Sequence, residues 1–185
     1  MQKYIDQAVK IAYEEQEKTG MPLKPHIDLS REVGERIAKE LNADEGVVEI
    51  GTLMMDCMIG KALKENKLEQ HVQMSAKRAE QWLKTTDLDE KTKQNILACV
   101  NEHHGVKKFH SMESEIVCNA DCYRFVSIKG FTYALRYLRE MPFEGLVKLL
   151  NNKVEEKWNA LTLDICKEEL QSQYELIKGF LNYLK

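Results

Sequence analysis

The sequence predicts an all-α fold, and three observations support that prediction. Nearly every segment repeats its apolar residues at the period of an α-helix, and none shows the sustained alternation of a β-strand. Only three prolines and nine glycines occur among 185 residues, so few positions suit tight β-turns or long linkers. A chain of this length can enclose one substantial core. We therefore expect one helical domain over residues 1–185, without internal repeats.

Three helices are expected in the first third of the chain. The first carries an apolar stripe and ends near Thr19-Gly20, since glycine often terminates a helix. Two prolines make residues 21–25 a connector, because proline disfavours helix at the residue before it. The second helix follows over about residues 26–41, and residues 42–44 form a link and cap. The third, over about residues 45–63, is apolar on almost all sides, which predicts a central buried helix.

The helical pattern continues to the end of the sequence. Gly105 closes one helix, and residues 106–111 form a loop. Residues 127–130 separate the last three helices from the others, and these last helices carry apolar stripes that predict a packing role. The expected helices span about residues 68–84, 89–104, 112–125, 132–140, 143–160 and 163–184.

Composition and charge exclude several classes of function. The formal net charge of -3 gives no general attraction to nucleic acid or to an anionic membrane. No stretch approaches the roughly 18 consecutive apolar residues of a membrane span, and the polar N-terminal segment has no signal-peptide core. Five cysteines without close pairing argue against a disulfide framework. We expect a cytoplasmic protein that binds neither nucleic acid nor membrane, and the sequence leaves its oligomeric state open.

Two carboxylates lie in apolar surroundings. Asp56 belongs to the apolar third helix, and Asp121 lies in the apolar stretch 116–122. A buried carboxylate is costly unless it is paired with a cation, hydrogen-bonded or coordinated to a metal. For Asp56 alone, a structural pairing with a lysine or a helix end is as good an explanation as a functional site. The second such residue strengthens the case for a site.

Four histidines stand at the ends of predicted helices. His26 and His71 are near helix starts, where surface placement is the simpler explanation, and His103-His104 end a helix, a position that suits a cation. Together with the two aspartates, however, they form a donor set for one or two divalent ions of the Mn, Fe, Ni or Zn type. Two ions about 3.5–4 Å apart could activate water and clamp a phosphoryl group, with an aspartate as the bridge.

The order of these residues resembles the HD-domain superfamily of metal-dependent phosphohydrolases. The resemblance spans about residues 25–125, which would be an HD-like core followed by a C-terminal helical packing region at about 127–185. It rests on five local strings: His26-Ile27-Asp28-Leu29-Ser30, Leu53-Met54-Met55-Asp56, His71-Val72-Gln73-Met74-Ser75-Ala76, Glu102-His103-His104-Gly105 and Asn119-Ala120-Asp121.

The resemblance implies a role for each of these polar residues. His26, Asp56 and Asp121 would hold a first divalent ion (Mn, Fe, Ni, Zn or Mg), and Asp56 would be shared with a second ion and act in catalysis. His71, with one or both of His103 and His104, would complete the second ion's shell. The chain departs from the family at Met55, where the His-Asp doublet requires histidine, since a thioether is a poor ligand for such cations.

Three hypotheses for the function follow. The first is hydrolysis of a nucleotide or another small phosphate ester, with Arg124, Lys107 and Lys77 as phosphate-binding residues. Arg124 follows Asp121 by three residues and so shares its helix face. The second, favoured by Met55, is a catalytically impaired HD-domain protein that binds metal or nucleotide as a sensor or partner module. The third is a helical interaction protein whose histidines share no site.

Overall fold

The computed structural model describes residues 1–184 and confirms the all-α prediction, because no strand occurs among these residues. Most helix bounds lie close to those expected from the sequence, and the one over residues 143–160 agrees at both ends. In chain order the helices are α1 (Gln2–Thr19), α2 (Lys24–Glu40), α3 (Glu45–Met54), α4 (Ile59–Lys64), the 3₁₀-helix η1 (Leu68–Gln70), α5 (His71–Leu83), α6 (Glu90–Glu102), α7 (Met112–Val126), α8 (Ile128–Tyr137), α9 (Phe143–Ala160) and α10 (Asp164–Tyr183).

Local signals in the sequence account for several helix ends. Gly20 follows α1 in the left-handed region at φ 81°, a conformation that glycine adopts at little cost. The side chains of Asp44, Asp89 and Ser111 each accept a hydrogen bond from a backbone N–H of the helix that follows. These N-caps satisfy donors that a helix cannot satisfy internally, and they fix where α3, α6 and α7 begin.

The expectation of one continuous helix over residues 45–63 is wrong. Residues 55–58 form turns between α3 and α4, so Asp56 lies in a break. The N–H of Met58 donates to Ser75 Oγ (3.1 Å), and the N–H of the first α4 residue donates to the Asp56 carbonyl (3.0 Å). Neither bond belongs to the i→i−4 ladder of an α-helix. The apolar pattern alone could not show this break, because both halves are buried.

The separator expected at residues 127–130 is also wrong, because α8 begins at Ile128. Ser127 caps this helix, and its Oγ accepts a hydrogen bond from the N–H of Gly130 (3.0 Å). A Cβ on Gly130 would lie 2.3 Å from the carbonyl oxygen of Tyr123, so only glycine allows α8 to approach α7 this closely.

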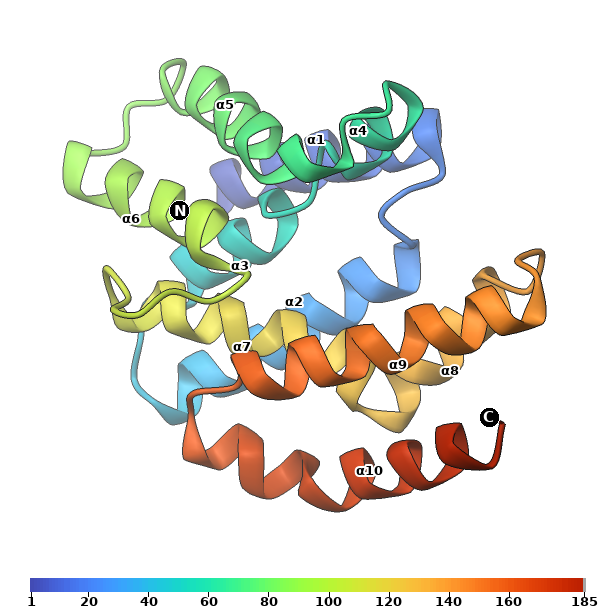
Figure 1. Cartoon of the computed structure of the whole chain (residues 1–185). Helices are drawn as coiled ribbons and strands as arrows, with labels where there is room; N and C mark the ends of the chain where they lie inside the picture. The colour runs from blue at the N-terminus through green and yellow to red at the C-terminus, as the bar shows by residue number, and fades with distance from the viewer. Residues whose placement is uncertain (185) are drawn as a thin grey trace.

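Two buried clusters of apolar side chains hold the helices together. The larger joins α1, α2, α3, α5, α6 and α7 with the start of α10, and the smaller lies among α8, α9 and α10. Figure 1 shows α1, α4 and α5 on one side of the molecule and α8, α9 and α10 on the other, with α2, α3 and α7 between them. Within residues 1–184, no helix combines the length and apolar character needed to cross a bilayer.

Candidate metal centre

Asp56 divides its carboxylate oxygens between two groups of partners. Oδ1 lies 3.4 Å from His71 Nε2 and 3.3 Å from His103 Nε2, whereas Oδ2 accepts a hydrogen bond from Arg124 Nη2 at 2.7 Å. The residue is only 3% exposed. Burial is the largest single influence and raises the pKa of the carboxyl, but Arg124 and the neighbouring His103 and His71 together outweigh it and hold the pKa well below its usual range. Asp56 is therefore an anion with one oxygen directed at the histidines.

The tautomers of two histidines follow from their second contacts. His103 Nδ1 lies 2.8 Å from the carbonyl oxygen of Val100, and His71 Nδ1 lies 2.6 Å from that of Leu68. A carbonyl only accepts, so each Nδ1 carries a hydrogen, and the neutral form of each ring has its lone pair on Nε2. Both Nε2 atoms face Asp56 Oδ1, which is itself an acceptor. Among residues 1–184, neither Asp56 Oδ1 nor His103 Nε2 has a hydrogen-bond partner of good geometry despite its burial. A cation at their centre would make this arrangement favourable.

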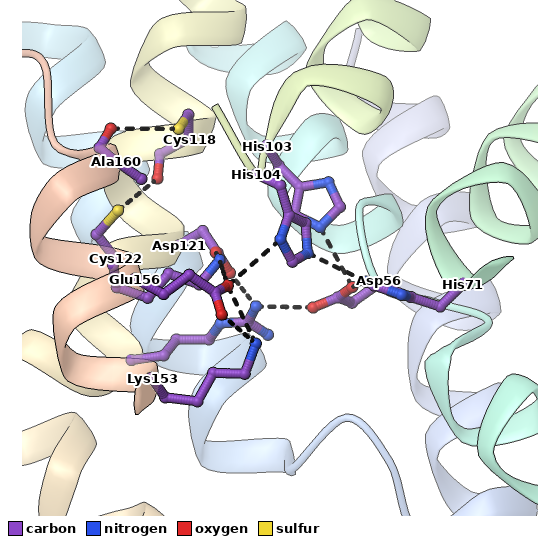
Figure 2. Close-up of polar contacts among 12 residues, drawn as sticks. Asp56, His71, His103, His104, Cys118, Asp121, Cys122, Lys153, Glu156 and Ala160 are labelled. Atoms are coloured by element: carbon purple, nitrogen blue, oxygen red, sulfur yellow. Dashed lines mark hydrogen bonds and ion pairs between the residues drawn. The ribbon is translucent and has the colours of Figure 1, made fainter. Parts of the chain in front are cut away.

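His104 adds a third imidazole from the more exposed side. Its Nε2 lies 3.1 Å from His71 Nε2, and its Nδ1 lies 3.6 Å from Glu156 Oε1. The contact with Glu156 raises the pKa of His104. Burial and the charges of neighbouring groups lower that pKa by a larger amount, so it lies below the usual value. The same contact lowers the pKa of Glu156 to about 2. Figure 2 shows the three rings and Asp56 turned toward one another, with Glu156 on the side of His104 away from Asp56.

The spacing of these four donors fits a divalent ion. One ligand atom from each of Asp56, His71, His103 and His104 can be chosen so that all lie within 4.8 Å of one another. Metal–ligand bonds of about 2.0–2.2 Å place adjacent ligand atoms about 3.0–3.5 Å apart. The observed separations of 3.1, 3.3 and 3.4 Å fall in this range. Carbonyl contacts that fix the far nitrogen of each ring are also typical of metal-binding histidines.

Asp121 lies beside this group and contacts cations of the chain itself. Arg124 Nη2 donates to Asp121 Oδ1, and Lys157 Nζ lies 2.5 Å from Asp121 Oδ2. All three side chains are buried. Burial raises the pKa of Asp121, and the charges of Arg124 and Lys157 more than reverse that effect, so the carboxyl is ionised. Asp121 thus forms part of a closed ion-pair cluster with Arg124, Lys157 and the outer oxygen of Asp56.

His26 and Met55 are not directed at the group of four donors. His26 Nε2 lies 3.1 Å from the carbonyl oxygen of Gly130, so this nitrogen carries the hydrogen. Burial and the charge of Arg124 lower the pKa of His26 to about 4, which keeps the ring neutral. Met55 is 1% exposed and belongs to the apolar core. The structure therefore brings together Asp56, His71, His103 and His104, and holds His26 and Asp121 in other contacts.

The three expected phosphate-binding residues occupy different places. Lys107 lines an open hollow of about 510 Å³ whose wall also includes His104 and Glu156. Lys77 lines another hollow of about 480 Å³, together with Lys61, Lys67 and Arg78. Arg124 is 6% exposed and is bound by two carboxylates. Of the three, Lys107 shares a hollow with one of the four donors.

Two site residues were missed in the sequence because they lie in the C-terminal region expected to serve only packing. Glu156 and Lys157 come from α9, and they contact His104 and Asp121, respectively. The C-terminal region therefore makes polar contacts with this group in addition to packing. Lys157 could have been noticed, because it follows Leu150 and Val154 on the apolar face of its helix. A lysine on such a face requires a buried anionic partner.

Comparison with known proteins supports the fold more than the function. No family model matches the sequence, and no curated protein matches it either. Among solved structures, a predicted HD superfamily hydrolase from an uncultured Thermotogales bacterium superposes with a TM-score of 0.70 at 14% identity, covering 96% of this chain and 89% of that one. Bacillus subtilis YpgQ gives 0.68 at 17% identity, with coverage of 97% and 94%.

A second structure of YpgQ, in complex with ADP, gives a TM-score of 0.67 at 16% identity with the same coverage. These superpositions extend over nearly the whole chain, including the C-terminal helices. They confirm that the chain resembles the HD superfamily in its fold, and the cluster of histidines with Asp56 agrees with that resemblance.

Proposed function

We propose that this chain, which has the HD-superfamily fold, is a metal-dependent phosphohydrolase that acts on a nucleotide or another small phosphate ester. Asp56, His71, His103 and His104 would hold its divalent ion. The observation that carries the proposal is the convergence of Asp56 Oδ1 with Nε2 of His71 and of His103, two rings whose Nδ1 atoms each face a backbone carbonyl oxygen. A divalent ion bound there supplies Lewis acidity and lowers the pKa of water near it toward neutrality.

The chain's own residues would hold and orient the reacting groups. Val100 and Leu68 fix two imidazole rings through their carbonyl oxygens, so both rings present Nε2 inward. Glu156 contacts the far nitrogen of His104 and orients the third ring. Because His104 is the exposed member of the group, the substrate would approach over it. Glu156, with its lowered pKa, would be a permanent anion at that entrance.

The substrate's phosphate would enter the hollow beside His104. Lys107 lines this hollow and can neutralise a phosphate oxygen, while Asn159 and Thr162 offer hydrogen bonds. The volume of about 510 Å³ suits a small molecule. YpgQ was crystallised with ADP, so nucleoside phosphates are the first substrates to test. We propose Lys107 as the phosphate-binding residue at this hollow.

The test combines ion binding with turnover. Protein stripped with a chelator is titrated with Mn²⁺ and Ni²⁺, and a panel of nucleoside phosphates and simple phosphate esters is assayed with each ion. His103→Ala is expected to lose ion affinity by at least tenfold together with activity, because it removes a buried ligand. His110→Ala, at an exposed loop histidine, is the control and should change neither. Unchanged ion binding in His103→Ala would contradict the proposal.

A second candidate function is binding without turnover, and Met55 favours it. The residue that precedes Asp56 is a buried methionine in place of the doublet's histidine, and no imidazole supports Asp56 from that side. This candidate predicts that ion and nucleotide bind with no product formed from any ester in the panel. Ion titration alone cannot separate the two candidates, so turnover at saturating ion decides between them.

A further inference from the structure

Two buried anions and two buried cations form a balanced cluster beside the four ion-binding donors. Its members are Asp56, Asp121, Arg124 and Lys157, each no more than 6% exposed. Arg124 Nη2 bridges Asp56 Oδ2 and Asp121 Oδ1, and Lys157 Nζ reaches Asp121 Oδ2. Three of the four carboxylate oxygens are therefore occupied by cationic groups of the chain. The remaining one, Asp56 Oδ1, faces the histidines.

We infer that Arg124 and Lys157 replace a metal ion between Asp56 and Asp121, so that the centre binds one divalent ion instead of two. This inference rests on the proposed function, which places that single ion among Asp56, His71, His103 and His104. It makes Arg124 and Lys157 positioning residues: they supply the positive charge that both carboxylates need, and they hold Asp56 with Oδ1 toward the imidazoles.

Charge and donor chemistry exclude an ion at that second place while the cluster is intact. The two carboxylates carry two negative charges, and Arg124 and Lys157 already balance them. An additional divalent ion would face two buried like charges at close range, where repulsion is weakly screened. Few other donors could help: His26 Nε2 contacts a carbonyl, which leaves that ring Nδ1 alone, and Met55 offers only a thioether in the apolar core.

Lys157 also gives the C-terminal region a role in the centre. It comes from α9, which packs along α7, and it is 2% exposed. Burial alone lowers the pKa of a lysine, but the charge of Asp121 reverses that effect and raises the pKa above its usual value, so Lys157 remains a cation. Because Lys157 belongs to α9, the position of this helix determines whether the charges of the two aspartates are balanced.

Ion stoichiometry in a matched pair of variants tests the inference. Asp56 and Asp121 are both buried and both contact Arg124, but only Asp56 faces the histidines. Mn²⁺ and Ni²⁺ titrations followed by calorimetry, with elemental analysis after desalting, are expected to give one ion per wild-type chain. Asp56→Asn should lose that ion or weaken its binding at least 100-fold. Asp121→Asn should retain it with affinity within about tenfold of wild type.

The outcomes separate the inference from the proposed function. Two ions per wild-type chain, or loss of an ion in Asp121→Asn, would overturn the inference and leave the proposed function standing. Absence of any ion from the wild type would refute the proposed function. In that case the double variant Arg124→Met/Lys157→Met still tests the inference, because it frees three carboxylate oxygens.

That double variant is expected to bind one ion more than the wild type, a gain that a purely structural role for the two cations would not produce. Since the variant leaves two buried carboxylates unpaired, it is prepared with Mn²⁺ present. An unchanged ion count in the folded double variant would contradict the inference. If the double variant does not fold, the Asp121→Asn titration decides where the wild type binds an ion. Where the wild type binds none, the comparison of Lys157→Met with Lys153→Met in the ion-free protein decides.

Lys157 has a matched control on its own helix. Lys153 lies one turn earlier on α9 and contacts Glu156 at the surface, whereas Lys157 contacts buried Asp121. Lys157→Met is expected to lower the melting temperature of the ion-free protein by about 6–20 °C, because it leaves a buried carboxylate with one cation fewer. Lys153→Met should shift it by no more than about 2 °C. Equal shifts in the two variants would show that Lys157 does not neutralise Asp121.

Discussion

Acidification from pH 8 to pH 5 should destabilise the protein through His26. The ring is 4% exposed, its Nε2 donates to the carbonyl of Gly130, and it packs edge-on against Phe125 and Tyr133. Burial is the main reason why its pKa falls from 6.5 to about 4, and the nearby charge of Arg124 adds to it. The folded protein therefore keeps His26 neutral at a pH where the unfolded chain protonates it.

The sign and size of the effect follow from linkage. Between pH 6.5 and pH 4 the unfolded state binds the additional proton, so the free energy of unfolding falls as the pH falls. A shift from 6.5 to about 4 corresponds to about 3 kcal/mol in full. At pH 5 the expected loss relative to pH 8 is about 2 kcal/mol, because most of the titration of the unfolded state is complete there. For a slope of about 2 kcal/mol/M, the urea midpoint should fall by about 1 M.

The assay compares urea unfolding of the chelator-treated wild type, His26→Gln and His110→Gln at pH 8 and pH 5. Other groups titrate in this range, so the difference between the proteins isolates His26. His26→Gln should lose about 2 kcal/mol less than wild type on acidification, since glutamine does not ionise. His110 is exposed, and its substitution should leave the wild-type dependence intact. Equal pH dependence in wild type and His26→Gln would refute the reasoning.

Three further predictions concern stability. Asn119→Ala should lower the free energy of unfolding by about 2–4 kcal/mol, because the buried side chain accepts hydrogen bonds from two backbone N–H groups just before α10 (3.1 and 3.2 Å). Asn101→Ala at an exposed site should change the urea midpoint little. Gly51→Ala should cost about 1–3 kcal/mol, since its Cβ would lie 2.7 Å from a side-chain atom of α6, whereas Gly179→Ala meets nothing within 4 Å and should be neutral or stabilising. A divalent ion at 100 times its Kd should stabilise the chelated protein by about 2.7 kcal/mol, or about 5–11 °C in a thermal melt, and no shift would contradict the proposed centre.

The helices could be predicted because they depend on local pattern, and local pattern also marked two unusual carboxylates. Apolar periodicity marks each helix, and Asp56 and Asp121 are conspicuous as carboxylates in apolar surroundings. The break at residues 55–58 could not be predicted, since it is set by a contact between Met58 and Ser75 across 17 positions of sequence. That break decides the direction of the Asp56 side chain.

The partners of these side chains could not be predicted either, because they also depend on contacts between residues far apart in the sequence. Arg124 was expected to face Asp121 from its spacing of three residues, and it does, but its second contact with Asp56 depends on how α7 packs against α3. That contact withdraws the guanidinium from solvent, where a phosphate could have met it. Lys157 belongs to a helix that the family resemblance did not cover, so only the packed structure could connect it to Asp121.

The cation cluster changes what Met55 means. If the missing imidazole were the only defect, Met55→His should create a second ion site. In this chain Asp56 Oδ2 and both oxygens of Asp121 contact Arg124 and Lys157, so a histidine at position 55 would meet no vacant carboxylate. Met55→His alone is therefore expected to leave the ion count of calorimetric titration at the wild-type value, whereas the same change combined with Arg124→Met and Lys157→Met should raise it by one. A second ion in the single variant would show that a metal can displace Arg124 and Lys157 from the carboxylates. The residue at position 55 alone would then determine the number of ions bound.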